Sequence, residues 1–132
     1  MSPAARDDRL PDGSLKAKLF RGLADSSRLA VLEALRDGPR CVSEVVAATG
    51  LSQPNASAHL ACLGECGLVN RERRGRFVYY AIADKRVVRI LEEAEAILAE
   101  VGSHVYRCTR YEVRAPAARR ARTRRRPGRS GA

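Results

Sequence analysis

Two of the 4 cysteines are spaced so that they could bind one metal ion together. Cys62 and Cys66 lie four residues apart in a segment with helical periodicity, which places their Cβ atoms on one helix face, about 5–6 Å apart. Cys108 follows the last predicted helix, in a segment free to bring a third thiolate to the pair. Three sulfur ligands favour large thiophilic ions over Mg²⁺ or Ca²⁺. The spacing therefore predicts a soft-metal site.

Other ligands and other thiol chemistry stay open at this point. Zinc usually takes a fourth ligand, which His59 or His104 could supply. Cys41 has no second cysteine two residues away, so we interpret it as a small buried residue. Oxidants could instead convert the thiols to a disulfide or a sulfenate, with Cys108 as the better partner for a bridge. A thiol enzyme would need an acid or base beside a reactive cysteine, and the sequence offers no such group.

The thiol pair lies at the end of a helix whose beginning is suited to reading DNA. Ser52 is predicted to cap this helix, which runs to about Glu65, and Pro54 lies in its first turn. A shorter helix, residues 42 to about 48, precedes it across a tight turn, a layout typical of a helix-turn-helix. Gln and Asn can pair with adenine, and Ser with bases or phosphates. The predicted DNA contacts here are Ser52, Gln53, Asn55, Ala56, Ser57 and His59.

After this helix the apolar period changes to two, which indicates strands. Residues 68–73 and 77–82 are predicted to form a hairpin that closes at Gly75. The arginines around its tip could lie along phosphates or in a minor groove. These predicted wing contacts are Arg71, Arg73, Arg74 and Arg76.

Helices are also predicted on either side of this unit. One starts at Ser14, and a second is capped by Asp25 or Ser26. A last one, capped by Asp84, runs to about Val101, with Gly102 marking its end. The predicted fold class is therefore mainly α with a small β-hairpin wing, a winged helix-turn-helix.

The last helix carries apolar residues in alternating steps of four and three, the spacing of a helix–helix seam. Little else in so small a chain could cover that seam, which favours a homodimer; packing on the chain's own first helix is the alternative. A dimer would also suit DNA half-sites one helical turn apart. The seam residues are Val87, Leu91, Ala94, Leu98 and Val101.

Charge separates a folded domain from a basic tail. The formal net charge is +10, but residues 114–132 contain eight arginines and no acidic residue, so the preceding residues carry only +2. Such a tail can attach loosely to any polyanion, which leaves open a nonspecific DNA-binding protein driven by the tail. We divide the chain into a disordered arm (1–13), the winged domain (14–101), a segment carrying Cys108 (102–113) and a disordered Arg-rich tail (114–132).

The hydropathy of the sequence indicates in which cellular compartment the protein is expected. No apolar run reaches the roughly 18–20 residues that a membrane span needs, and the N-terminus lacks the apolar stretch of a secretory signal. We therefore expect a cytoplasmic protein, in which thiols stay reduced. Neither a membrane partner nor a small organic substrate is expected.

Several stretches can be compared with known families. They are residues 23–29 (LADSSRL), 52–60 (SQPNASAHL) and 67–69 (GLV), followed by Gly75-Arg76 and Tyr79-Tyr80. In order and spacing they resemble the ArsR/SmtB family of winged-helix metalloregulators, over about residues 15–101. The resemblance implies a homodimer built on the first and last helices, and repression that an inducer relieves. It also places His59 in the recognition helix, in a role of orienting that helix.

Residues 60–69 (LACLGECGLV) are similar to the CmtR-type cadmium and lead sensors of that family. The similarity implies that Cys62 and Cys66 bind the ion with a C-terminal cysteine of the partner subunit, here Cys108; donation within one subunit stays open. The expected function is a repressor that binds double-stranded operator DNA as a dimer and releases it when these thiols bind a divalent thiophilic ion. Cadmium and lead are the main candidates for the inducer, with zinc and mercury as alternatives.

We expect deletion of residues 114–132 to leave specific DNA recognition intact, because the winged helix and not the tail should read the sequence. DNase footprinting of the full-length and truncated chains on one protected fragment measures this. Should the footprint vanish with the tail, DNA binding would be driven by the tail alone.

Overall fold

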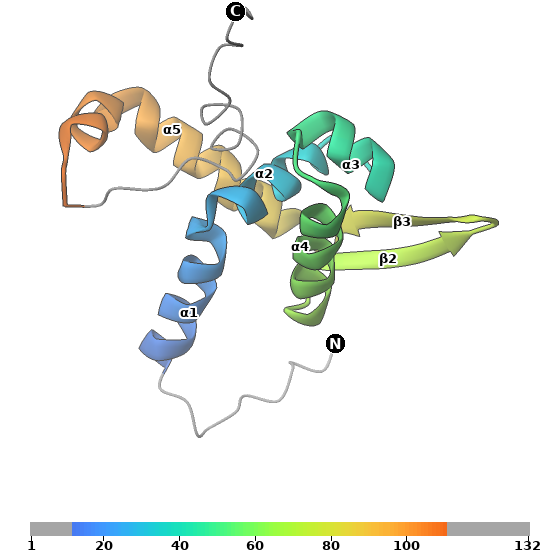
Figure 1. The fold of residues 1–132 in the computed structure, drawn as a ribbon. Coiled ribbons are helices and arrows are strands. Elements are labelled where there is room, and N and C mark those ends of the chain that lie inside the picture. Colours follow the sequence, from blue (N-terminus) through green and yellow to red (C-terminus); the bar gives the residue numbers. More distant parts are fainter. Residues whose placement is uncertain (1–11, 111–132) are drawn as a thin grey trace, which may run out of the picture.

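Five helices and three strands make up the part of the chain that the structure, a computed structural model, describes, residues 12–110. Figure 1 shows α2, α3 and α4 as the body, from which the β2–β3 hairpin projects on one side and α5 extends on the other. The elements are α1 (Asp12–Ala24), α2 (Ser26–Ala34), β1 (Arg40–Cys41), α3 (Val42–Thr49), α4 (Gln53–Glu65), β2 (Val69–Arg74), β3 (Phe77–Ile82) and α5 (Lys85–Arg107).

The predicted cap residues start three of the helices. Asp25, Ser52 and Asp84 each accept a hydrogen bond from a backbone amide two or three residues later, at the first turns of α2, α4 and α5. For Asp25 the distances from Oδ1 are 2.9 Å to the Ser27 nitrogen and 3.0 Å to the Arg28 nitrogen. These bonds satisfy amides that have no partner within the helix. The predicted starts of these helices are confirmed.

The hydrophobic core lies between α2, α3 and α4 and receives residues from α5. Its largest fully buried side chains are Val31, Leu32, Val45, Leu51, Leu60 and Leu63. Val87 and Leu91 of α5 belong to the same cluster, so the first half of the predicted seam packs into the chain's own core. Leu98 and Val101, further along the seam, are exposed. The seam is therefore divided between core and surface.

The strands form an antiparallel sheet in the order β1-β3-β2. The wing hairpin is confirmed: β2 and β3 pair from Val69 opposite Ile82 to Arg74 opposite Phe77. The sequence did not predict β1, because a strand of two residues has no periodicity to detect. Its pairing with β3 joins the hairpin to the start of α3.

The last helix is longer than predicted. Gly102 does not end it, because α5 continues to Arg107 and Cys108 is its C-cap. A glycine inside a helix costs only about 1 kcal/mol relative to alanine, which continued helical hydrogen bonding and packing can offset. His104 and Arg107 also place basic side chains in the last turn, near the negative end of the helix dipole. The prediction that residues 102–107 are irregular is therefore wrong.

The two ends of the chain are described only in part. Residues 12 and 13, assigned above to a disordered arm, are the first residues of α1. The remainder of that arm, residues 1–11, and the Arg-rich tail, residues 114–132, lie outside the described residues. No helix within residues 12–110 is long and apolar enough to cross a membrane.

Arg36 connects α5 to the body. Its guanidinium donates hydrogen bonds to the carboxylates of Glu33, at 3.0 Å, and of Glu95 on α5. These two side-chain hydrogen bonds raise the pKa of Arg36. The contact lies beyond Leu91 on α5, so it holds the helix to α2 where its burial in the core ends.

We expect Asp25→Ala to lower the free energy of unfolding by about 1 kcal/mol, because the amides of Ser27 and Arg28 are left without their acceptor. For a domain of this size the melting temperature should fall by roughly 4–8 °C. Asp25→Asn is the matched control, since it keeps a capping oxygen and removes only the charge. Calorimetry of the three proteins measures the difference, and equal melting temperatures would contradict the capping role.

The charged Asp25 carboxylate should make the wild type more stable to unfolding than the Asp25→Asn control at neutral pH. Acid should remove this difference in stability. Partial burial acts to raise the pKa of the Asp25 carboxyl, but hydrogen bonds from the Arg28 and Ser27 amides and the charge of His59 outweigh it, so the pKa is lowered. A depressed folded pKa means that the stabilisation is complete above the unfolded pKa of about 3.9 and is lost as the pH falls through the folded value. Urea denaturation at neutral and acidic pH measures this loss.

Candidate nucleic-acid interface and metal-binding thiols

The first turn of α4 presents polar side chains to solvent. Ser52 caps the helix, and its Oγ accepts a hydrogen bond from the Asn55 amide at 3.2 Å. Gln53 and Asn55 are exposed, with no part in the core. Ala56 is fully buried in the core, so the predicted DNA contact of its side chain is wrong. An alanine has no polar group that could have distinguished the two faces in advance.

Polar residues follow one stripe along α4, at the border of its buried face. Asn55, His59, Cys62 and Cys66 are separated by steps of four, three and four, which is the spacing of one helix face. Leu60 and Leu63 lie on the neighbouring buried face, about 100° around the helix from this stripe. The helix therefore places a predicted DNA contact and two thiols on the same face, at opposite ends.

His59 lies in the middle of this stripe. Its side chain is half-buried, and its charge is among the causes that lower the pKa of the Asp25 carboxyl. Asp25 caps α2, so a positive charge on His59 favours the charged form of that cap. The role of orienting the helix, which the family resemblance implied for His59, stays a prediction.

The end of α4 is closed in a way that fixes Cys66. The Leu68 amide donates to the Leu63 carbonyl at 3.0 Å, and the Gly67 amide donates to the Gly64 carbonyl at 3.1 Å. Gly67 has a φ of 78°, the left-handed conformation that this type of helix ending requires. Cys66 itself keeps helical dihedral angles, and its amide donates to the Cys62 carbonyl at 3.0 Å. Both thiols thus retain the predicted helical relationship.

The cysteines differ in accessibility and are all free thiols. Cys66 is exposed and Cys62 is half-buried, so both can meet an ion from solvent. Cys108 is half-buried at the end of α5. Within one chain, residues 12–110 contain no group of three or more His, Cys, Asp or Glu side chains placed to hold a metal. The structure therefore brings Cys62 and Cys66 together and leaves Cys108 apart from them.

Cys41 has a structural position. It is buried as the N-cap of α3, where its amide donates to the Glu44 carboxylate at 3.1 Å and its Sγ lies 3.1 Å from the Ser43 Oγ. The hydrogen bonds from the amide and thiol of Cys41 lower the pKa of Glu44. These contacts support the interpretation of Cys41 as a small buried residue.

An apolar groove of about 800 Å³ runs beside Cys66, between α1 and the end of α4. Leu15, Leu19 and Leu68 line it, and Cys66 lies among them. Two of these leucines are among the exposed apolar residues of α1. The exposed thiol therefore faces a surface that a further protein segment could cover.

The wing carries its arginines on two faces. By the strand register, Arg71 and Arg73 share a face with Tyr80, and Arg74 lies on the opposite face with Tyr79. Arg74 forms an ion pair with Glu72 at 3.2 Å and lies over the Tyr79 ring, 5.3 Å from its centroid. The arginines are all exposed.

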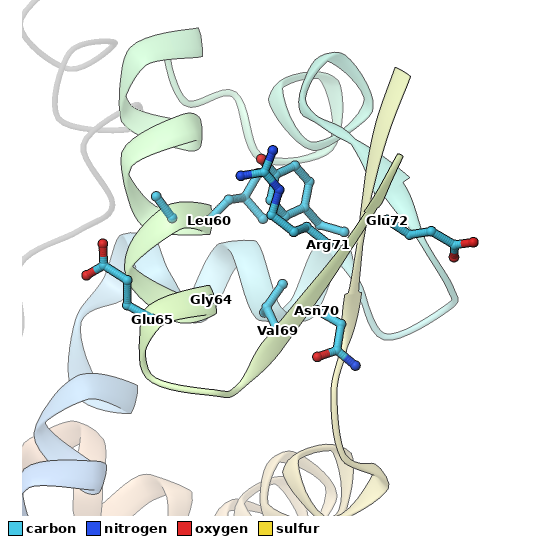
Figure 2. A pocket seen from close by; sticks show the side chains of 9 residues that line it. Leu60, Gly64, Glu65, Val69, Asn70, Arg71 and Glu72 are labelled. Atoms are coloured by element: carbon cyan, nitrogen blue, oxygen red, sulfur yellow. The ribbon is translucent and has the colours of Figure 1, made fainter. Parts of the chain in front are cut away.

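A groove of about 760 Å³ separates α4 from β2. Figure 2 shows Val69 and Arg71 pointing from β2 toward Leu60 on α4, while Glu72 points to the other side of the hairpin. Arg71 therefore projects from the wing toward α4. A phosphate passing between these two elements would meet a guanidinium there.

Comparisons with known proteins agree with this geometry. Residues 25–71 match the family model for bacterial regulatory proteins of the arsR family. The chain is 38% identical over 94 residues to the probable mercury resistance operon repressor of Streptomyces lividans, covering 71% of this chain and 75% of that protein. The chain belongs to the ArsR family. The expected family and winged helix-turn-helix fold are thereby confirmed, and the relatives are regulators of transcription rather than enzymes.

Two further similarities bear on the site. The HTH-type transcriptional regulator CmtR of Mycobacterium bovis is 42% identical over 88 residues, covering 67% of this ArsR-family chain and 75% of CmtR. A homodimeric winged helix-turn-helix DNA-binding domain, Mb0332 of Mycobacterium bovis, is 31% identical with a TM-score of 0.62. That match covers 83% of this chain and all (100%) of the solved domain.

Two features of the interface were not found from the sequence. Glu72 neutralises one wing arginine, and a carboxylate within a basic strand gives no sign of which neighbour it will pair with. The influence of the His59 charge on the pKa of the Asp25 carboxyl also depends on residues far apart in the chain, which the packing of α2 on α4 brings near each other.

We expect Arg76→Ala to weaken DNA binding on every sequence alike. The slope of log K against log salt concentration should become smaller by about 1, because one phosphate contact is lost. Arg76 is exposed at the hairpin tip and forms no ion pair with another residue of the range 12–110. Arg86→Ala is the control, because Arg86 already pairs with Asp84 at 2.6 Å at the start of α5. Fluorescence anisotropy over a salt series measures both slopes; an unchanged slope for Arg76→Ala would contradict the phosphate contact.

Proposed function

We propose that this ArsR-family chain is a metal-responsive transcriptional repressor, which binds operator DNA as a dimer and releases it when cysteine thiolates bind a thiophilic ion. One observation carries the proposal: Cys62 and Cys66 lie on the same face of α4 as Asn55. A single rigid helix thereby connects the ion site to the DNA-reading surface.

The proposed dimer uses the apolar surface that α1 and α5 leave exposed. On α1 the exposed apolar residues are Leu15, Leu19 and Phe20. On α5 they are Ile97, Leu98, Val101, Val105 and Tyr106. Apolar side chains gathered on two helices in this way mark a protein–protein interface. The homodimeric state of the similar Mb0332 domain supports the same assembly.

The proposed metal ligands are Cys62, Cys66 and Cys108, with the last supplied by the partner subunit. The separation of Cys108 from the pair within one chain favours donation across the dimer. The donor set of thiols fits a soft ion, and we propose Cd²⁺ or Pb²⁺ as the inducer, with Zn²⁺ or Hg²⁺ as alternatives. The names of the mercury resistance repressor and of CmtR among the relatives support a regulator of this kind.

In this mechanism the thiols lose their protons as they become ligands. The cysteine at the end of the partner's α5 then restrains α4. The orientation of α4 sets where Gln53 and Asn55 meet the groove of the DNA. Metal and DNA weaken each other's binding by the same factor, because the coupling free energy between two sites is reciprocal.

We expect Cd²⁺ to weaken operator binding of the reduced wild-type protein by about 5–150-fold, the usual range of such coupling. Cys62→Ser, Cys66→Ser and Cys108→Ser should each keep DNA binding and lose most of this response, together with the ultraviolet sulfur-to-metal absorption. Cys41→Ser is the matched control, because a serine retains the cap at the start of α3. If the wild-type protein bound its operator with the same affinity with and without saturating Cd²⁺, the proposal would be contradicted.

Mixed dimers test which subunit donates Cys108. One protomer carries Cys62→Ser and Cys66→Ser, and the other carries Cys108→Ser. A site shared across the dimer is complete once in this heterodimer, so about half of the wild-type Cd²⁺ absorption should return. A site within one subunit is complete in neither protomer, and no absorption should return.

A further inference from the structure

The tip of the wing carries an exposed aromatic ring among its arginines. Phe77 is 56% exposed, although it is one of only 2 phenylalanines in the chain. It is the first residue of β3 and pairs with Arg74, so only Gly75 and Arg76 separate the two strands. Gly75 has a φ of 61°, a left-handed conformation suited to such a tight hairpin. The turn thus holds Phe77 at the end of the projecting hairpin.

The surroundings of Phe77 indicate a polyanionic occupant. By the strand register, its ring lies on the same face as Arg74 and Tyr79, and Arg76 is its neighbour in the chain. Within the hairpin the one carboxylate is Glu72, and it is paired with Arg74. A protein partner that buried the ring would also have to bury these guanidinium groups, whereas DNA phosphates would neutralise them.

The position of the tip separates it from the proposed dimer surface. Figure 1 shows the β2–β3 hairpin and α5 extending from opposite sides of the body, with α1 on the side away from the hairpin tip. The exposed apolar residues of α1 and α5 therefore form a different surface. A second copy that covers those helices leaves Phe77 uncovered.

We propose that Phe77 enters the minor groove beside the half-site and wedges between two base pairs, while the neighbouring arginines contact the flanking phosphates. This inference rests on the proposed DNA binding and specifies which surface of the DNA the hairpin tip contacts. The minor groove, about 6 Å wide, admits side chains from a hairpin tip but not the hairpin itself. Apolar side chains inserted there unstack a base step and bend the duplex. Flexible pyrimidine–purine steps resist this least, so Phe77 gives the protein a sequence preference outside the major-groove contacts.

The test uses a duplex that the full-length wild-type protein selects from a random-sequence library. 2-Aminopurine replaces adenine at pyrimidine–purine steps on both flanks of the footprint, where its fluorescence rises on unstacking. The proteins compared are the wild type, Phe77→Ala and Phe77→Leu, with thermal melting to establish that each is folded. Because the ring is largely exposed, both variants should keep the wild-type melting temperature.

We expect wild-type binding to raise the fluorescence at one step on each flank, and Phe77→Ala to abolish that rise. The affinity of Phe77→Ala should fall roughly tenfold, the usual effect of replacing an aromatic side chain that stacks on a base by alanine. Its salt slope should stay unchanged, because the ring carries no charge, and this distinguishes it from Arg76→Ala. Phe77→Leu should retain most of the fluorescence rise, since leucine is still an apolar wedge.

Each opposite outcome is decisive. A folded Phe77→Ala variant that matches the wild type in affinity and fluorescence overturns the wedge and leaves the proposed repressor intact. Weaker binding without any wild-type fluorescence rise overturns insertion, because the ring then contacts DNA without unstacking it. A wild-type protein that selects no duplex overturns both proposals together.

Discussion

The burial of one side of α4 is the constraint on which the remaining structure depends. Ala56, Leu60 and Leu63 are almost completely inaccessible, packed against α2 and α3. Since a helix is rigid, fixing this side also fixes the direction of the neighbouring stripe, from Asn55 to Cys66. Large-to-small substitutions at positions such as Leu60 would therefore disturb the DNA surface and the thiol pair together, as well as the core.

Much of this arrangement was predictable because it depends on local rules. Ser52 and Asp84 are cap residues whose effect is confined to one helical turn, and the hairpin follows from a period-two pattern that closes at a glycine. The adjacency of Cys62 and Cys66 likewise needs only a helix. These features are decided by neighbours in sequence, so a single chain without relatives sufficed to predict them.

The failures share a physical reason, which is that tertiary contacts decided the outcome. Ala56 belongs to the core because of how α4 rolls against α2 and α3, which its small side chain does not reveal. Gly102 lies inside α5 because a single glycine is a weak helix stop when the flanking residues continue the helix. The proposed ligand role of Cys108 stays a prediction, because it involves a second subunit whose position no pattern within one chain determines.

The distance along α4 limits how an ion at the thiols could affect DNA. Cys66 lies eleven positions after Asn55 in the sequence, which is about 16 Å along a helix. An ion at that distance neither occupies the base contacts of the first turn nor cancels their hydrogen bonds. Its effect must therefore pass through the orientation of the whole helix. In a dimer, a small rotation of each α4 changes the spacing of the two reading surfaces, and DNA half-sites tolerate little change in that spacing.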